Sequence, residues 1–278
     1  MFQTIVKIFL LVIITAAITP FIRKLAFVLG AVDNPNARRI NKKPMPTIGG
    51  LAIFVAFNIG EFVLLRKDFP THELFSVLLA SSVIILTGLI DDILELKPRQ
   101  KMFGIFVASL VVYFLAGIKV RELSLPFLGH IQLGWWSFPL TIFWILALTN
   151  AVNLIDGLDG LATGVTLISL VTMGIVGFFF LKSWQHYVPI MCIMLAACLL
   201  GFLPYNFHPA KIFWGDTGAL YIGFMISVLS LKGLKNVTFV SLLVPILILG
   251  VPITDTVYAM IRRKLNKKNI SQADKHHL

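Results

Sequence analysis

The sequence predicts an all-α, polytopic membrane protein with about nine transmembrane helices in a single domain, residues 1–278. Hydrophobic residues make up 58% of the chain and charged residues 13%, whereas soluble domains average about 45–50% and 25%. So few charges cannot cover a surface that faces water. The apolar residues also gather in runs close to the ~20 residues that a helix needs to cross a bilayer. The lipid bilayer is therefore the first expected partner.

Nine apolar runs define the expected helices in chain order. They cover residues 4–22, 48–65, 74–90, 102–118, 138–155, 161–181, 187–204, 217–231 and 237–261. The segment 119–136 alternates polar and apolar residues around a Pro-Gly turn, so we expect a short hairpin there, with Trp135 and Trp136 as interface anchors.

Basic residues indicate the orientation of these helices. The net charge is +11, and 16 of the 24 Lys and Arg residues fall in alternate loops that include the C-terminal tail, against seven in the other loops. Because basic residues gather on the cytoplasmic side of membrane proteins, the N-terminus is expected outside and the C-terminus inside. This topology accounts for the positive charge, so no nucleic-acid partner is expected.

A pair of adjacent carboxylates, Asp91 and Asp92, ends the third apolar run on the inner side. Adjacent carboxylates repel each other unless a cation or a shared proton lies between them. Hard cations such as Mg²⁺ take oxygen ligands and leave coordination positions for phosphate oxygens. The alternative is that the pair only caps and solvates a helix end.

A second polar cluster follows the fifth run and repeats every three residues through Asn150, Asn153, Asp156 and Asp159. This spacing places neighbouring members on one side of a helix or of its frayed end. A simple polar turn would not need four oxygen-bearing side chains in register. We consider this the strongest local indication of a site.

A third cluster lies between residues 206 and 218. Asp216 stands between glycines, Phe213 could stack on a base, and Asn206 could read one with its amide. Asp216 also precedes an apolar run, so helix capping competes with metal binding as its role. Lys211 suits lipid phosphate as well as substrate.

Two basic segments complete the inner face. The loop 33–50 includes Arg38 and Lys43, and the tail 262–278 includes Arg263 and His277. Positive side chains beside an acidic site suit a polyphosphate or lipid-phosphate substrate. The alternative for most of them is the ordinary positive charge of cytoplasmic loops.

Taken together, these blocks resemble the polyprenyl-phosphate N-acetylhexosamine-1-phosphate transferase family. The resemblance rests on Gly-Leu-Ile-Asp91-Asp92, Asn-Leu-Ile-Asp156-Gly-Leu-Asp159-Gly-Leu-Ala and His208-Pro-Ala-Lys-Ile-Phe213-Trp-Gly-Asp216-Thr-Gly. Pro44-Met-Pro-Thr-Ile-Gly-Gly and Ala273-Asp274-Lys275 are more similar to the N-acetylglucosamine branch, and within it to the enzymes that initiate wall teichoic acid synthesis. This implies a multi-pass protein of the bacterial cytoplasmic membrane.

The resemblance implies transfer of N-acetylglucosamine 1-phosphate from the UDP-sugar to undecaprenyl phosphate, with release of UMP, at the cytoplasmic face. Such a step initiates a cell-envelope polymer, teichoic acid or O-antigen. It implies Mg²⁺ as cofactor, with Mn²⁺ as an alternative, and a homodimer as a further expectation. Direct attack by the lipid phosphate is favoured over a route through an aspartyl intermediate, which stays open.

Site roles follow from the same resemblance. The implied catalytic residues are Asp91, Asp92, Asp156 and Asp159. The implied substrate-binding residues are Asn153, Asn206, Phe213, Lys211, Arg38, Lys43, Arg263 and His277. The implied metal ligands are Asp216, Asn153, Asp91 and Asp92.

Two departures and two rival functions accompany the resemblance. Family members usually have a histidine where this chain has Asn41, and they continue past His277 with further histidines and helices, so the C-terminus is expected to be truncated relative to the family. An inward-facing ion-coupled transporter would also place carboxylates in the membrane, but usually near mid-bilayer with an inverted repeat. Another Mg²⁺-dependent membrane phosphotransferase is the second alternative.

Overall fold

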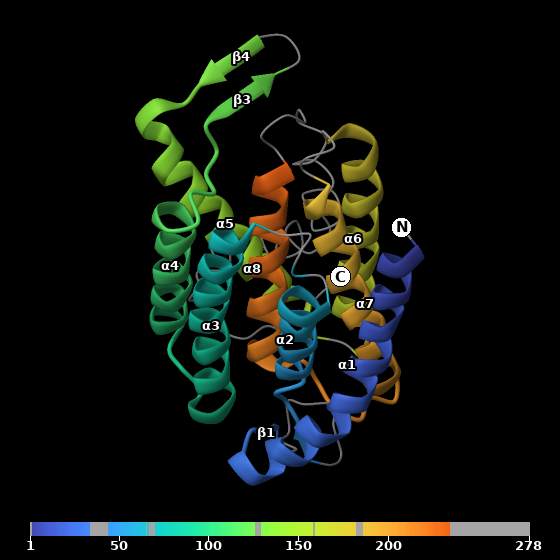
Figure 1. The fold of residues 1–278 in the computed structure, drawn as a ribbon. Helices are drawn as coiled ribbons and strands as arrows, with labels where there is room; N and C mark the ends of the chain where they lie inside the picture. Colours follow the sequence, from blue (N-terminus) through green and yellow to red (C-terminus); the bar gives the residue numbers. More distant parts are fainter. Residues whose placement is uncertain are drawn as a thin grey trace.

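The computed structural model describes residues 2–33, 44–64, 66, 70–125, 129–157, 159–181 and 186–233. Over these residues the chain forms a helical bundle with two short antiparallel sheets (Figure 1). The helices are α1 (Phe2–Leu29), α2 (Gly50–Ile59), the π-helix η1 (Gly60–Leu64), α3 (Thr71–Leu94), α4 (Pro98–Phe114), the 3₁₀ turn η3 (Gly134–Trp136), α5 (Ser137–Ile155), α6 (Leu161–Phe180), α7 (Tyr187–Asn206) and α8 (Gly215–Gly233). The strands are β1 (Val32–Asp33), β2 (Met45–Pro46), β3 (Glu122–Leu125) and β4 (Gly129–Gln132).

The helical architecture predicted from the sequence is confirmed, and it is consistent with a polytopic membrane protein. Each of the first eight predicted runs lies on a helix, and the ninth, 237–261, lies outside the described residues. Five segments in the described part are long and apolar enough to cross a membrane: Gln3–Leu29, Thr71–Leu94, Gly134–Ile155, Leu161–Phe180 and Tyr187–Asn206. A total of nine spans and the N-out orientation stay predictions.

Helix α8 forms the centre of the bundle. It packs against α2, α3, α5 and α7, and its side chains from Thr217 to Lys232 are buried. A helix that is buried all round lacks the polar face of a surface helix. Its first turn is therefore held by neighbours on every side, and that turn carries Asp216.

Glycines allow α8 to approach its neighbours closely. A Cβ added to Gly50 of α2 would lie 2.0 Å from the Cα of Gly218, and one added to Gly88 of α3 would lie 2.5 Å from the Cα of Thr217. Small residues at such crossings let helix backbones come together. The start of α8 is thus fixed against α2 and against the last turns of α3.

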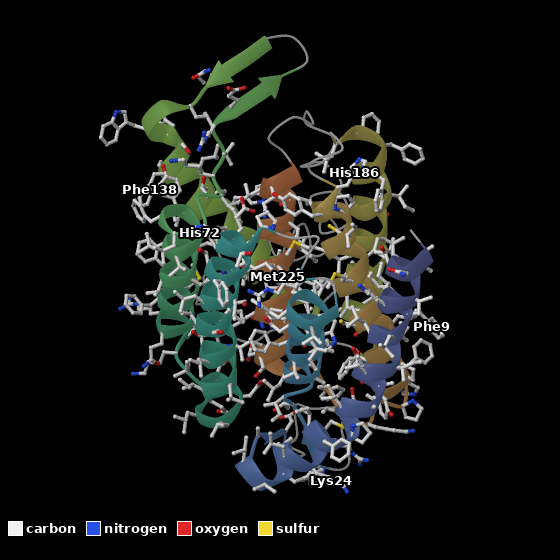
Figure 2. All side chains as sticks on the ribbon, in the orientation of Figure 1. Phe9, Lys24, His72, Phe138, His186 and Met225 are labelled. Carbon is white, nitrogen blue, oxygen red and sulfur yellow. The ribbon has the colours of Figure 1, made fainter. Side chains whose placement is uncertain are left out.

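The two ends of the bundle differ in character. At the hairpin end, β3 pairs with β4 from Glu122 opposite Gln132 to Leu125 opposite Gly129, which is the hairpin expected from the sequence. Trp135 and Trp136 beside it are 98% and 74% exposed. At the other end, here called the acidic end, α3 and α5 end and α8 begins. Figure 2 places Lys24 there, with His72 and His186 toward the hairpin.

Candidate active site

Asp92, in the last turn of α3, serves as an N-terminal cap for α8. Its Oδ1 accepts the backbone N–H of Asp216 at 2.9 Å, and its Oδ2 accepts the N–H and the hydroxyl of Thr217 at 2.9 and 2.6 Å. The first N–H groups of a helix have no partner within the helix, so an acidic side chain there is stabilising. Asp92 therefore positions Asp216. The catalytic and metal-binding roles predicted for Asp92 stay predictions.

Gly215, which directly precedes Asp216, is required by the close contact between Asp92 and the start of α8. Its φ is +67°, and a Cβ there would lie 1.7 Å from the Thr47 carbonyl oxygen and 2.5 Å from the Asp92 carboxylate. Positive φ without a Cβ penalty is a property of glycine. Only glycine lets the loop before α8 come this close to α3.

Asp91 is almost fully buried, with 4% of its surface exposed. Its Oδ1 accepts the Leu96 backbone N–H at 2.7 Å, and its Oδ2 lies 2.5 Å from the Lys101 ammonium. Both oxygens therefore hold the short turn that joins α3 to α4. The catalytic and metal-binding roles predicted for Asp91 stay predictions.

Lys101, in the first turns of α4, links the two acidic groups. Its Nζ lies 3.0 Å from Asp216 Oδ2 as well as 2.5 Å from Asp91 Oδ2. Burial raises the pKa of Asp216, but its contacts with Asp91 and Lys101 outweigh burial and hold that pKa below the usual range. Asp216 is thus kept ionised beside a fixed positive charge.

The end of α5 brings Asn153 and Asp156 to the same place. The Asn153 side-chain amide donates to Asp216 Oδ1, across 63 residues of sequence. Asp156 follows the last residue of α5, and burial, together with the negative charge of Asp216, raises its pKa to about 7. Predicted members of the first three polar clusters therefore meet at Asp216.

Asp216 and Asn153 carry oxygen atoms of the kind that Mg²⁺ takes as ligands. In the described part of the chain no group of three or more His, Cys, Asp and Glu side chains is placed to hold a metal ion. Mg²⁺, however, usually takes only one or two carboxylates and fills its other positions with water and substrate phosphate. The Lys101 ammonium between two carboxylates shows that this point favours positive charge.

Asp159 and Asn206 join the α5–α6 loop to the α7–α8 loop. Asp159 Oδ2 accepts the Ala210 backbone N–H at 3.1 Å and lies 3.0 Å from His208 Nδ1. The buried Asn206 accepts the Thr163 hydroxyl at 2.6 Å and donates to the Ile212 carbonyl at 3.2 Å. Asn206 therefore shapes the loop, and its predicted contact with a base stays a prediction.

Phe213 is held through its backbone. Its N–H donates to the Pro46 carbonyl at 2.9 Å, and its carbonyl accepts the Gly49 N–H at 2.9 Å. The Phe213 side chain is half-buried and Lys211 is exposed. This pairing brings the predicted motif at 44–50 against the one at 208–218.

Four predicted substrate-binding residues lie outside the described residues: Arg38, Lys43, Arg263 and His277. Two residues at the site were missed as site candidates by sequence reasoning. Lys101 was counted only among the inner basic residues, although the short turn before α4 makes its first turns face the end of α3. His208 begins the motif at 208–218, but the sequence assigned it no role.

Comparison with known proteins places the chain in a family. The family model described as glycosyl transferase family 4 matches residues 74–234. The chain belongs to glycosyl transferase family 4. The matched range spans α3 to α8, and so includes all of the acidic residues that meet at Asp216.

The relatives of this chain are transferases by their names. The chain is 44% identical to the probable undecaprenyl-phosphate N-acetylglucosaminyl 1-phosphate transferase of Bacillus subtilis, over 94% of the chain and 72% of that protein. It is 33% identical to the phospho-N-acetylmuramoyl-pentapeptide-transferase of Clostridium botulinum, over 93% and 81%. It is also 33% identical to the decaprenyl-phosphate N-acetylglucosaminephosphotransferase of Mycolicibacterium smegmatis, over 96% and 72%. The similarity to these relatives and the five apolar helices together indicate that the chain is a multi-pass protein of the cell membrane.

Proposed function

We propose that this chain transfers N-acetylglucosamine 1-phosphate from UDP-N-acetylglucosamine to undecaprenyl phosphate and releases UMP. The observation that carries the proposal is the meeting of Asp216, Lys101 and Asp91, with Asn153, at one end of the bundle. The relative from Bacillus subtilis, by its name, performs this kind of transfer. The family membership supports the same class of reaction.

The chemistry is a displacement at phosphorus. A phosphate oxygen of the lipid attacks the phosphorus that bears the sugar, and a new phosphorus–oxygen bond forms. The bond from that phosphorus to the bridging oxygen breaks, and its electron pair leaves with UMP. Stabilisation of the spread negative charge is the main task of such a site.

Direct attack by the lipid phosphate is favoured over an aspartyl intermediate. Asp91 is held by the Leu96 N–H and by Lys101, and Asp92 is held by the start of α8. A nucleophilic carboxylate would first have to give up these contacts. The phosphate of the acceptor is already largely ionised at neutral pH and needs no strong base.

Mg²⁺ is proposed as the cofactor, with Mn²⁺ as an alternative cation. Asp216 and Asn153 would hold it through their oxygens, and Asp92 and Lys101 would keep Asp216 in place. The bound cation would supply positive charge next to the donor phosphates. The acidic end is proposed to face the cytoplasm, where the UDP-sugar is present, and the homodimer stays a prediction.

The test is UMP release by the purified full chain in detergent. The assay contains undecaprenyl phosphate, UDP-N-acetylglucosamine and Mg²⁺, and each is omitted in turn. We expect UMP only in the complete mixture, and its loss in excess EDTA should be reversed by added Mg²⁺. UMP release without the lipid would contradict the proposed transfer.

Matched variants separate the site from the fold. Asp216→Asn keeps the size of the side chain and removes its charge, so activity should fall at least a hundredfold. Glu122→Gln makes the same type of change on β3 at the hairpin end and should leave activity unchanged. Equal activity in the wild-type and Asp216→Asn proteins would overturn the assignment of the site.

A further inference from the structure

The α7–α8 loop, residues 207–214, is held beside α6 and the α5–α6 loop by two layers of contacts. The inner layer is buried: Asn206 bonds to Thr163 on α6 and to Ile212 in the loop. The outer layer lies nearer the surface, where Asp159 bonds to Ala210 and His208. Phe213, in the same loop, lies three residues before Asp216. The position of this loop therefore affects the site.

The outer layer orients one carboxylate. Asp159 Oδ2 receives both the Ala210 N–H and the His208 contact, at 3.1 and 3.0 Å. No partner for Asp159 Oδ1 is recorded among the residues that the structure describes. Within the described residues one oxygen is thus anchored, and the other can accept a hydrogen bond from a bound molecule.

The His208 side chain is too exposed to stabilise the loop by packing. Its side chain is 81% exposed, whereas that of Asp159 is 26% exposed. Its recorded polar contact is with Asp159 alone among the described residues. Nδ1 must carry the proton in this contact, because an ionised carboxylate only accepts. His208 therefore orients the Asp159 carboxylate.

We infer that His208 is a positioning residue for the UDP-sugar: it fixes Asp159 so that the free oxygen is ready to bind the donor. This inference rests on the proposed function. It assigns His208 to donor binding, because a carboxylate oxygen accepts hydrogen bonds and, of the two proposed substrates, the UDP-sugar is the one that carries N–H and O–H groups. A pre-oriented carboxylate binds more tightly because less rotamer freedom is lost on binding.

The experiment compares His208→Ala with His208→Asn in the full chain. Asparagine carries its amide nitrogen at the position of Nδ1, so it restores the donor to Asp159, whereas alanine removes it. In steady-state UMP release, His208→Ala should raise the KM for UDP-N-acetylglucosamine about three- to tenfold, the effect of one lost hydrogen bond. The kcat and the KM for undecaprenyl phosphate should stay within about twofold. His208→Asn should recover most of the donor KM.

Two further measurements separate the inference from the proposed function. His72→Ala removes an exposed histidine at the hairpin end and should change neither KM. Equilibrium binding of UDP-N-acetylglucosamine, followed without the lipid, should weaken in His208→Ala by the same factor as the KM rises. An active wild-type protein with equal donor affinity in His208→Ala, or with no rescue by His208→Asn, would overturn the inference alone. A wild-type protein that neither binds the donor nor releases UMP would overturn both.

Discussion

Asp92 and Asp216 lie 124 residues apart, yet the Asp92 carboxylate accepts the backbone N–H of Asp216 at 2.9 Å. This single contact ties the end of α3 to the start of the central helix. It also fixes the backbone at Asp216, whose side chain contacts Asn153 and Lys101. An acidic pair that reads as a metal site in the sequence is thereby divided: Asp92 caps α8, and Asp91 holds Lys101.

Loss of the cap should reduce both stability and activity. Asp92→Ala removes three hydrogen bonds at the start of α8, and N-cap removal costs about 1–2 kcal/mol. We expect a lower Tm in detergent and at least a tenfold loss of UMP release. Glu95→Gln, an exposed change near the same helix end, should alter neither value. An unchanged Tm in Asp92→Ala would show that the cap adds nothing.

Lys101 should be needed for its charge. Lys101→Met keeps much of the side-chain length but leaves Asp91 and Asp216 without the ammonium between them. We expect about a hundredfold lower kcat, because a fixed charge of this kind contributes on that order. Lys101→Arg should retain part of the activity. Thermal unfolding of the same samples checks that the fold persists, and wild-type kcat in Lys101→Met would contradict the prediction.

Two glycine substitutions should differ in their effect on stability. Gly215→Ala places a Cβ against the Thr47 carbonyl and requires an unfavourable φ, so it should cost more than about 1 kcal/mol. Gly164→Ala, within α6, meets nothing within 4 Å and should be neutral or stabilising by up to about 1 kcal/mol. Detergent melting curves compare the two. A Gly215→Ala protein that melts like wild type would contradict the close approach described here.

Asp156 should make stability depend on pH. Its folded-state pKa is raised to about 7, above the ordinary value of 3.8, so the folded chain holds a proton that the unfolded chain releases. Stability from this group is complete below the ordinary pKa and is lost as the pH rises toward 7. Asp156→Asn should therefore show a smaller fall in Tm between pH 5 and pH 7.5 than the wild type. Equal falls in both proteins would rule out this contribution.

Much of the fold could be predicted because its causes are local. Apolar runs mark α1 to α8, and the turn-flanked alternation at 119–136 marks the β3–β4 hairpin. The boundaries differ where polar residues are absorbed into helices. Asp91 and Asp92 lie within α3, which extends to Leu94, because partners on α4 and α8 satisfy their carboxylates. The predicted run 48–65 divides into α2 and the π-helix η1.

The sequence by itself determined that this chain spans a membrane and that its polar residues gather in a few clusters, since hydrophobic length and motif spacing are properties of neighbouring residues. Only the tertiary structure decided what each side chain does. Asp92 became a cap, Lys101 a bridge and Asp159 an anchor for the α7–α8 loop because their partners come from other helices and loops. A hydrogen bond depends on distance and direction between atoms, and packing around α8 sets both.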